Sequence, residues 1–284
     1  MKVGFLIGGA LIVIGLLLEL CVGPVVWETF AWPVNGIVLG AFVMMIVVMH
    51  LLRGRFYAFR FLSTYQAAIP VMCYAVVLTI MMGLTRQTAN GRGLSNMLTF
   101  WPFVLTYVYM AVIVGLVVLK SRWSMKAPNK MVAGIFHLGL FITMTTATLG
   151  NADMQRLKMI TAVGEKEWRA LDPQGRVKEM PLAIELKKFI METYDDGSPK
   201  RFASEILIQT KAGTDLLTTV DVNKPAEVDG WKIYQYGYDT SMGAQSRTSI
   251  LELVSDPWLR LVYLGIYLML FGGVLMFVFG VRRK

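Results

Sequence analysis

The chain has 284 residues, 55% of them hydrophobic, and a formal net charge of +9 at pH 7. This composition, with a mean hydropathy of +0.55, is typical of an integral membrane protein and argues against a soluble globular one. The two cysteines, Cys21 and Cys73, form no disulfide framework, no Cys-x-x-Cys redox pair and no Cys-x-x-Cys-His attachment motif. The sequence is therefore neither a thiol oxidoreductase nor itself a c-type cytochrome.

Six apolar segments are expected to cross the bilayer, because each can span about 30 Å of hydrocarbon at about 1.5 Å per residue. They lie near residues 3–22, 34–52, 66–85, 99–119, 131–149 and 258–281. The first begins like a signal peptide, with Lys2 before an apolar run. However, the large Leu20 precedes Cys21 and there is no small-residue cleavage site, so a retained helix is expected.

A polar block between the fifth and sixth segments is expected to form an external domain. Residues 151–257 hold 14 Lys and Arg against 17 Asp and Glu, so their formal charge is slightly negative. Short alternating runs such as Trp231–Tyr236, separated by Gly- and Pro-containing turns, favour about seven antiparallel strands, arranged as a small sheet or a sandwich. Tyr234, Tyr236 and Tyr238 would share one face of a strand, as a partner-facing or half-buried surface.

The excess positive charge lies in alternate loops of the membrane part. The three clusters are Arg53, Arg55 and Arg60; Lys120, Arg122, Lys126 and Lys130; and Arg282, Arg283 and Lys284. The positive-inside rule then puts both termini in the cytoplasm and the 151–257 domain on the outer side of the membrane. The charge thus reports topology in a lipid bilayer, and no nucleic-acid partner is expected.

The expected fold is a polytopic α-helical membrane protein of six transmembrane helices, with a small β-rich external domain inserted between helices five and six. Residues 1–65 would form an N-terminal two-helix hairpin with a basic cytoplasmic loop, and residues 66–150 the core helices three to five. Residues 151–257 would form the external domain. Residues 258–284 would form the final helix and a basic tail.

His137 is the main candidate site residue, because it lies within the fifth segment, about 10 Å from the cytoplasmic end. Ionisable side chains are costly in a bilayer, and neutral imidazole is a strong iron ligand. Residues at helical spacing on its face are Gly134, Phe141, Met144 and Thr148. Gly134 and Gly139 would admit a flat macrocycle or a neighbouring helix. A histidine hydrogen-bonded between packed helices is the alternative.

Two further side chains, those of His50 and Met144, are of a type that can bind iron. His50, near the cytoplasmic end of the second segment, differs from His137 in depth by roughly one helical turn, so a two-histidine site is geometrically allowed. An interfacial histidine is the more ordinary explanation. Met144 lies about 10 Å further along the helix than His137, so it cannot share an iron with it, and apolar packing explains it better.

An ordered series of motifs follows His137. It consists of His137-Leu-Gly-Leu-Phe141, Val222-Asn-Lys-Pro225, Gly230-Trp-Lys-Ile-Tyr-Gln235 and Asp256-Pro257. This series resembles the ResB-like (CcsB-type) proteins of System II cytochrome c biogenesis, over roughly residues 66–281. The external domain is shorter than is usual in that family. The first two segments are additional to the common core, so the resemblance assigns nothing to His50.

The resemblance implies a membrane subunit of a heme-export and cytochrome c synthetase complex, which helps deliver heme across the membrane for covalent attachment to apocytochrome c. His137 would be an axial ligand to the iron of heme b. A CcsA (ResC)-type membrane partner would carry most of the chemistry, so this chain has no catalytic residue of its own, and whether it counts as an enzyme is left open. The alternative is a scaffold or apocytochrome-binding subunit that binds no heme. A transporter subunit is disfavoured, since Glu19 is the only acid within the six segments.

Overall fold

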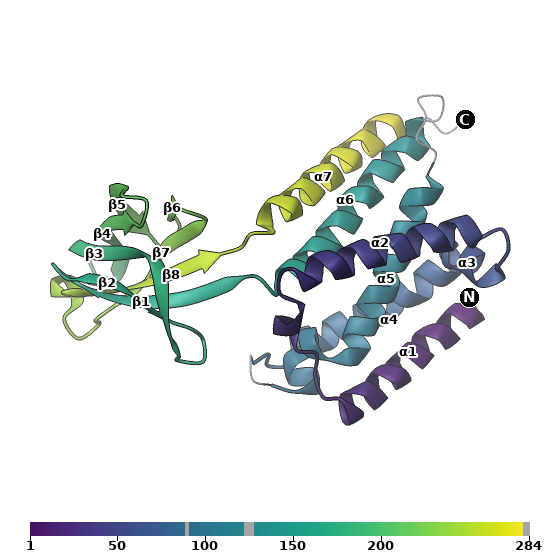
Figure 1. The fold of residues 1–284 in the computed structure, drawn as a ribbon, viewed down its shortest axis with the longest axis horizontal. Coiled ribbons are helices and arrows are strands. Elements are labelled where there is room, and N and C mark those ends of the chain that lie inside the picture. Colours follow the sequence, from purple (N-terminus) through teal and green to yellow (C-terminus); the bar gives the residue numbers. More distant parts are fainter. Residues whose placement is uncertain (89–90, 122–127, 281–284) are drawn as a thin grey trace. The chain divides into compact units, whose positions relative to one another are not determined.

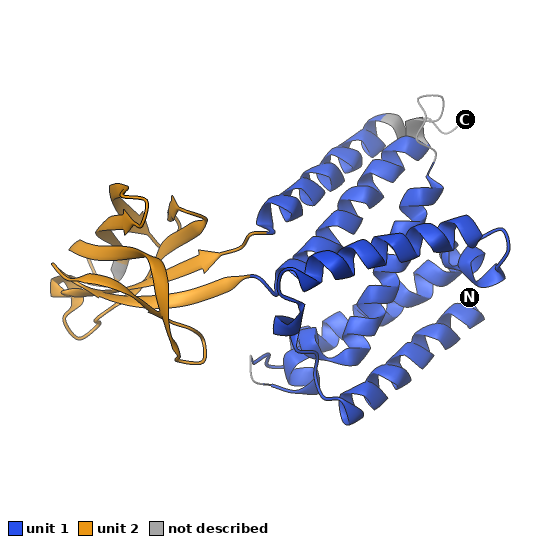
Figure 2. Ribbon diagram, viewed as in Figure 1, with its two compact units in different colours: residues 1–153, 258–284 blue, residues 154–257 orange. Residues whose placement is uncertain are grey.

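The computed structural model describes residues 1–88, 91–121 and 128–280 (Figure 1). They form two compact units, one of residues 1–153 with 258–284 and the other of residues 154–257 (Figure 2). We call these the membrane unit and the β unit, and each is described by itself.

Six helices of the membrane unit are long and apolar enough to cross a bilayer, as a multi-pass membrane protein requires. They are α1 (Lys2–Cys21), α2 (Val34–Leu52), α4 (Tyr65–Leu84), α5 (Trp101–Lys120), α6 (Pro128–Gly150) and α7 (Leu259–Gly280). Their ends agree with the predicted segments to within three residues. Short connecting helices that were not predicted are η1 (Trp27–Phe30), α3 (Tyr57–Leu62) and η2 (Gly93–Thr99).

Helix α5 is the core of the membrane unit. Its residues from Ala111 to Leu116 are buried in succession, as expected for a helix that is surrounded by others. Ile113 packs with α4, Leu116 with α2, and Val114 with α6. Figure 1 shows the start of α1, the α3 segment and the end of α7 at one end of this unit. We call this the basic end, because the described bases Arg53, Arg60, Lys120 and Lys130 lie there. The other residues of the predicted basic clusters, Arg122, Lys126 and residues 282–284, lie outside the described residues.

Helices α6 and α7 pack closely through glycines. A Cβ atom at Gly139 would overlap backbone atoms of Gly265 and Met269 on α7, and one at Gly272 would overlap Phe136 on α6. Small residues allow this approach in a membrane, where packing rather than the hydrophobic effect holds helices together. The sequence predicted that Gly139 would admit either a flat macrocycle or a neighbouring helix, and the neighbouring helix is observed.

The β unit is a single antiparallel sheet. Its strands are β1 (Gln155–Ala162), β2 (Lys166–Leu171), β3 (Val177–Thr193), β4 (Pro199–Thr210), β5 (Asp215–Asp221), β6 (Ala226–Val228), β7 (Trp231–Tyr238) and β8 (Thr248–Ser255). The order across the sheet is β5-β4-β3-β2-β1-β8-β7-β6. Val220 of β5 and Ile233 of β7 share one buried core although their strands are far apart in this order, so the sheet curves around its apolar face. The antiparallel sheet was predicted, whereas the two-sheet sandwich is wrong.

The predicted common face of the three tyrosines is also wrong, because a β-bulge interrupts β7. The pairing with β8 shifts between Gln235 and Gly237, which leaves Tyr236 as the extra residue. Tyr238 therefore pairs with the buried Ser249, and its ring stacks on Phe189 with centroids 5.0 Å apart. A one-residue insertion moves every later side chain to the other face of a strand.

Gln235 ties this bulge into a buried polar network. Its Nε2 donates to the carbonyl of Gly237 at 2.7 Å, and its Oε1 accepts from the Ser249 hydroxyl at 3.0 Å. Ser249 in turn accepts from the Ser204 hydroxyl at 2.7 Å. Ser204 and Ser249 are fully buried and Gln235 nearly so, and a network satisfied in this way specifies one local arrangement.

Replacing Gln235 with leucine is expected to destabilise the β unit by roughly 1–3 kcal/mol, because the Gly237 carbonyl and the Ser249 hydroxyl lose a partner inside the protein. Hydrogen exchange of the intact chain, followed by mass spectrometry, would show faster exchange in β7 and β8. The exposed Gln174→Leu serves as the control. Unchanged protection in the Gln235 variant would contradict this prediction.

Candidate functional site

His137 is held by its own helix. The half-buried side chain places Nδ1 at 2.7 Å from the carbonyl oxygen of Ala133, one turn earlier in α6. Because a carbonyl oxygen can only accept, Nδ1 carries the proton of the neutral ring. Nε2 then keeps a lone pair. An imidazole that donates one N–H to a backbone carbonyl and coordinates with its other nitrogen is the usual arrangement of a metal-binding histidine. The hydrogen bond at Nδ1 joins two residues of α6. A histidine that served only helix packing was expected to form a hydrogen bond with another helix.

Two other residues of the His137 face, Phe141 and Met144, pack against other helices. Met144 is buried beside Ala111 of α5, and its carbonyl accepts from the Tyr107 hydroxyl at 3.1 Å. Phe141 stacks on Phe42 of α2 with ring centroids 6.2 Å apart. Met144 is therefore a packing residue, as predicted.

His50 is arranged differently from His137. Its Nδ1 lies 3.2 Å from Nη1 of Arg53 at the end of α2. Since a guanidinium only donates, Nδ1 is the acceptor and Nε2 carries the proton of the neutral ring. Neither nitrogen then offers an unused lone pair. A ligand role for His50 stays a prediction that this geometry does not favour.

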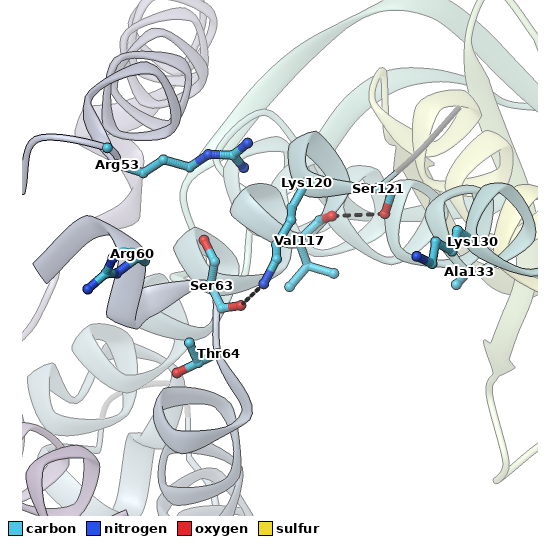
Figure 3. Close-up of a pocket in the computed structure, with 10 residues that line it drawn as sticks. Arg53, Arg60, Ser63, Thr64, Val117, Lys120, Ser121, Lys130 and Ala133 are labelled. Atoms are coloured by element: carbon cyan, nitrogen blue, oxygen red, sulfur yellow. Dashed lines mark hydrogen bonds between the residues drawn. The ribbon is translucent and has the colours of Figure 1, made fainter. Parts of the chain in front are cut away.

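A cavity of about 830 Å³ opens at the basic end of the membrane unit. Its lining residues come from the α2–α4 region and from the facing ends of α5 and α6: Arg53, Gly54, Arg60, Ser63, Thr64, Val117, Lys120, Ser121, Lys130 and Ala133. Figure 3 shows Arg53 reaching towards Lys120, whereas Arg60 points away from it. Ala133, whose carbonyl holds His137, thus also lines this cavity.

At the other end of the membrane unit, Asp153 joins three helices. Its carboxylate accepts from the backbone N–H of Trp32 and the side-chain amide of Asn35, both at 2.7 Å, and from the indole of Trp258 at 2.6 Å. Asn35 is fully buried and also donates to the Leu149 carbonyl. The start of α2, the end of α6 and the start of α7 are held together in this way.

Partial burial acts to raise the pKa of the Asp153 carboxyl, but the three hydrogen bonds outweigh it and hold that pKa below its usual range. A lowered pKa in the folded state means that the ionised carboxylate stabilises the fold above the unfolded-state pKa of about 3.9. This stabilisation is lost as the pH falls through the lower, folded-state pKa.

Asp153→Asn is therefore expected to destabilise the membrane unit by roughly 1–3 kcal/mol at neutral pH, because an amide supplies only one acceptor oxygen for three donors. The difference from the parent should shrink as the pH falls below about 4. Thermal unfolding in detergent at a series of pH values would measure both effects. Glu28→Gln, at an exposed position near Trp27, is the control. Equal unfolding temperatures at neutral pH would contradict this role of Asp153.

Comparison with known proteins gives a match for the stretch that holds His137 and Asp153. Residues 128–251 match the model of the ResB-like family. This segment is ResB-like. The resemblance expected from the motifs is thereby confirmed over residues 128–251 of the predicted stretch 66–281.

Curated relatives of the ResB-like segment carry the name cytochrome c biogenesis protein CcsB. The protein of Prochlorococcus marinus subsp. pastoris is 28% identical over 141 residues, covering 46% of this chain and 32% of the relative. That of Prochlorococcus marinus strain MIT 9313 is 32% identical over 128 residues, covering 45% and 27%. The chain thus spans about a third or less of the length of these relatives. A solved structure, cytochrome c heme lyase CcmF, aligns at 15% identity with a TM-score of 0.36, over 85% of this chain and 44% of that one.

The ResB-like segment holds only part of what the structure brings together. His50 and three of the four cavity bases lie outside it. Sequence reasoning used these bases only as markers of topology, and it missed the Asp153 network. One signal was available for the cavity: the sequence has no acidic residue between Glu28 and Asp153, so these bases have no acidic neighbour in the sequence.

Proposed function

We propose that this chain is a membrane subunit of a heme-export and cytochrome c synthetase complex, which delivers heme across the membrane for covalent attachment to apocytochrome c. The observation that carries the proposal is the His137 ring, whose Nδ1 donates to the Ala133 carbonyl, so that Nε2 keeps the lone pair that can coordinate a metal. The name of the matched relatives, cytochrome c biogenesis protein CcsB, supports the same process.

The donor chemistry fits heme b. His137 would supply one axial nitrogen, and a histidine of a CcsA-type partner the other. Bound heme supplies the iron and the vinyl groups that become linked to an apocytochrome. In this chain the Ala133 carbonyl keeps His137 in the tautomer that can coordinate, and Phe136, edge-on to the imidazole with ring centroids 5.7 Å apart, restricts how the ring turns.

The orientation of the chain in the membrane is also part of the proposal. With the basic end in the cytoplasm, both termini lie inside and the β unit lies on the periplasmic side. There the β unit would hold the apocytochrome or brace the partner.

Heme spectra of the purified chain test the proposal. We expect the chain, alone or with a CcsA-type partner, to show a reduced-minus-oxidised b-type signal that His137→Ala removes or shifts. A signal that is the same in both proteins, or absent from both preparations, would contradict heme binding and leave a scaffold subunit.

A further inference from the structure

We infer that the basic cavity between α3, α5 and α6 binds the carboxylates of the heme that His137 coordinates. This inference rests on the proposed function and names a part of that site. The ligand group is an anionic oxygen group on an amphiphile. It could come from the propionates of heme or from the headgroup of an anionic lipid, and the experiment below separates these two sources.

The charge around the cavity requires a counterion. Four bases line it, and none of its described lining residues is acidic. The sequence has no acidic residue from position 29 to 152, so no nearby carboxylate of this segment can neutralise them. Like charges that line one concave site repel one another and attract an anion that several of them can contact.

A second observation is an unsatisfied hydroxyl in the cavity wall. Ser63 is 8% exposed, and its Oγ has no hydrogen-bond partner among the residues that the structure describes. Its carbonyl accepts from the Lys120 ammonium at 2.9 Å, which fixes that charge beside the hydroxyl (Figure 3). Buried polar atoms normally have partners, so an orphan hydroxyl next to a fixed ammonium indicates a missing acceptor. A carboxylate would accept from both groups.

The cavity lies where a porphyrin bound at His137 can reach it. Helical side chains tilt towards the N-terminus of their helix, so His137 leans towards Ala133, which lines the cavity. Lys130 lies one turn before Ala133 on α6 and also lines it. A porphyrin carries both carboxylates on one edge, and its iron at the centre. Lys130 lies two turns, or about 10 Å, before His137 on α6, so an imidazole nitrogen and the bases of the cavity match the iron and the carboxylates of a single heme.

Heme binding to the full chain in nanodiscs of neutral phosphatidylcholine tests the inference. We would titrate heme and heme dimethyl ester, which lacks the free carboxylates, into the parent, Arg53→Gln, Lys130→Gln and the double variant, and read the Soret band. Lys120 is left in place because it also bonds the Ser63 carbonyl. Arg55→Gln is the matched control, since Arg55 lies in the same basic loop but is exposed and does not line the cavity.

We expect each cavity variant to bind heme about tenfold more weakly and to bind the dimethyl ester like the parent. Arg55→Gln should leave both affinities unchanged, and His137→Ala should weaken both. Equal heme affinities in parent and cavity variants, or equal losses for heme and ester, would overturn the inference and leave the proposed function standing. A difference seen only when phosphatidylglycerol is present would assign the cavity to lipid headgroups, and so would also overturn it. A parent that binds neither porphyrin would overturn the proposed function itself.

Discussion

His137→Gly is expected to abolish the b-type heme signal of the purified chain, and added imidazole is expected to restore it. The substitution removes the imidazole nitrogen that is proposed to coordinate the heme iron, and it leaves a space of about the size of the ring. Changes in groups that merely orient a ligating histidine cost about 10–100-fold in metal affinity, so losing the ligand itself should cost more than about 100-fold. Optical titration with heme, in the absence and presence of imidazole, measures both parts.

His50→Gly is the matched control for this experiment. It also removes a histidine from a membrane helix, but the Nδ1 of His50 is already occupied by Arg53. We expect the heme affinity of this variant to stay within a few-fold of the parent, since its ring offers no unused lone pair. If His50→Gly lost the signal and His137→Gly kept it, the site would have to be placed at the end of α2. Failure of imidazole to restore heme in His137→Gly would point to a packing role for His137.

Gly139→Leu is expected to disrupt the packing of α6 against α7 and to lower the yield of folded protein. Even a Cβ atom at this position would overlap backbone atoms of Gly265 and Met269. Backbone cannot move aside as the end of a flexible side chain can, so the cost should exceed the roughly 1–3 kcal/mol typical of overpacked cores. Retention of monodisperse protein after heating in detergent would measure the loss. Because α6 carries His137, heme affinity should fall together with it.

Gly40→Leu is the control for this effect, because Gly40 also lies within a long apolar helix, α2, and a Cβ atom there meets no other atom within 4 Å. Leucine is a better helix former than glycine by several tenths of a kcal/mol, so this variant should be as stable as the parent or more so. Equal losses in both variants would mean that leucine harms any of these helices. Unchanged stability of Gly139→Leu would mean that α6 and α7 do not pack closely.

The membrane helices could be predicted because their signal is local. A run of apolar residues of sufficient length crosses a bilayer whatever surrounds it, so the predicted segment at 34–52 coincides with α2. Helix α3, with six residues, has no such signal, and its position depends on the helices beside it. In the β unit, alternation predicted strands, but one inserted residue at Tyr236 reversed the face of Tyr238.

The candidate site was predicted only in part, because some of its features depend on contacts between segments that are far apart in the sequence. His137 could be chosen from the sequence, since an ionisable residue in an apolar run is costly and rare. Its preference over His50 depends on which nitrogen of each ring is already bonded, and this requires the positions of Ala133 and Arg53. The cavity joins residues as far apart in sequence as Arg53 and Lys130, and such a meeting has no local signature.

By itself, then, the sequence determined the number and limits of the apolar helices, the antiparallel nature of the polar block, the family resemblance and the choice of His137 as the candidate ligand. These depend on composition and spacing within one segment, where the bilayer or the pleat of a strand imposes the rule. Only the tertiary structure decided the tautomer of His137, the assignment of Gly139 to the contact with α7, the Asp153 network and the clustering of bases around Ser63. Each of these depends on the distance between atoms of different helices or on the direction of one side chain, and neither quantity is a property of a segment taken alone.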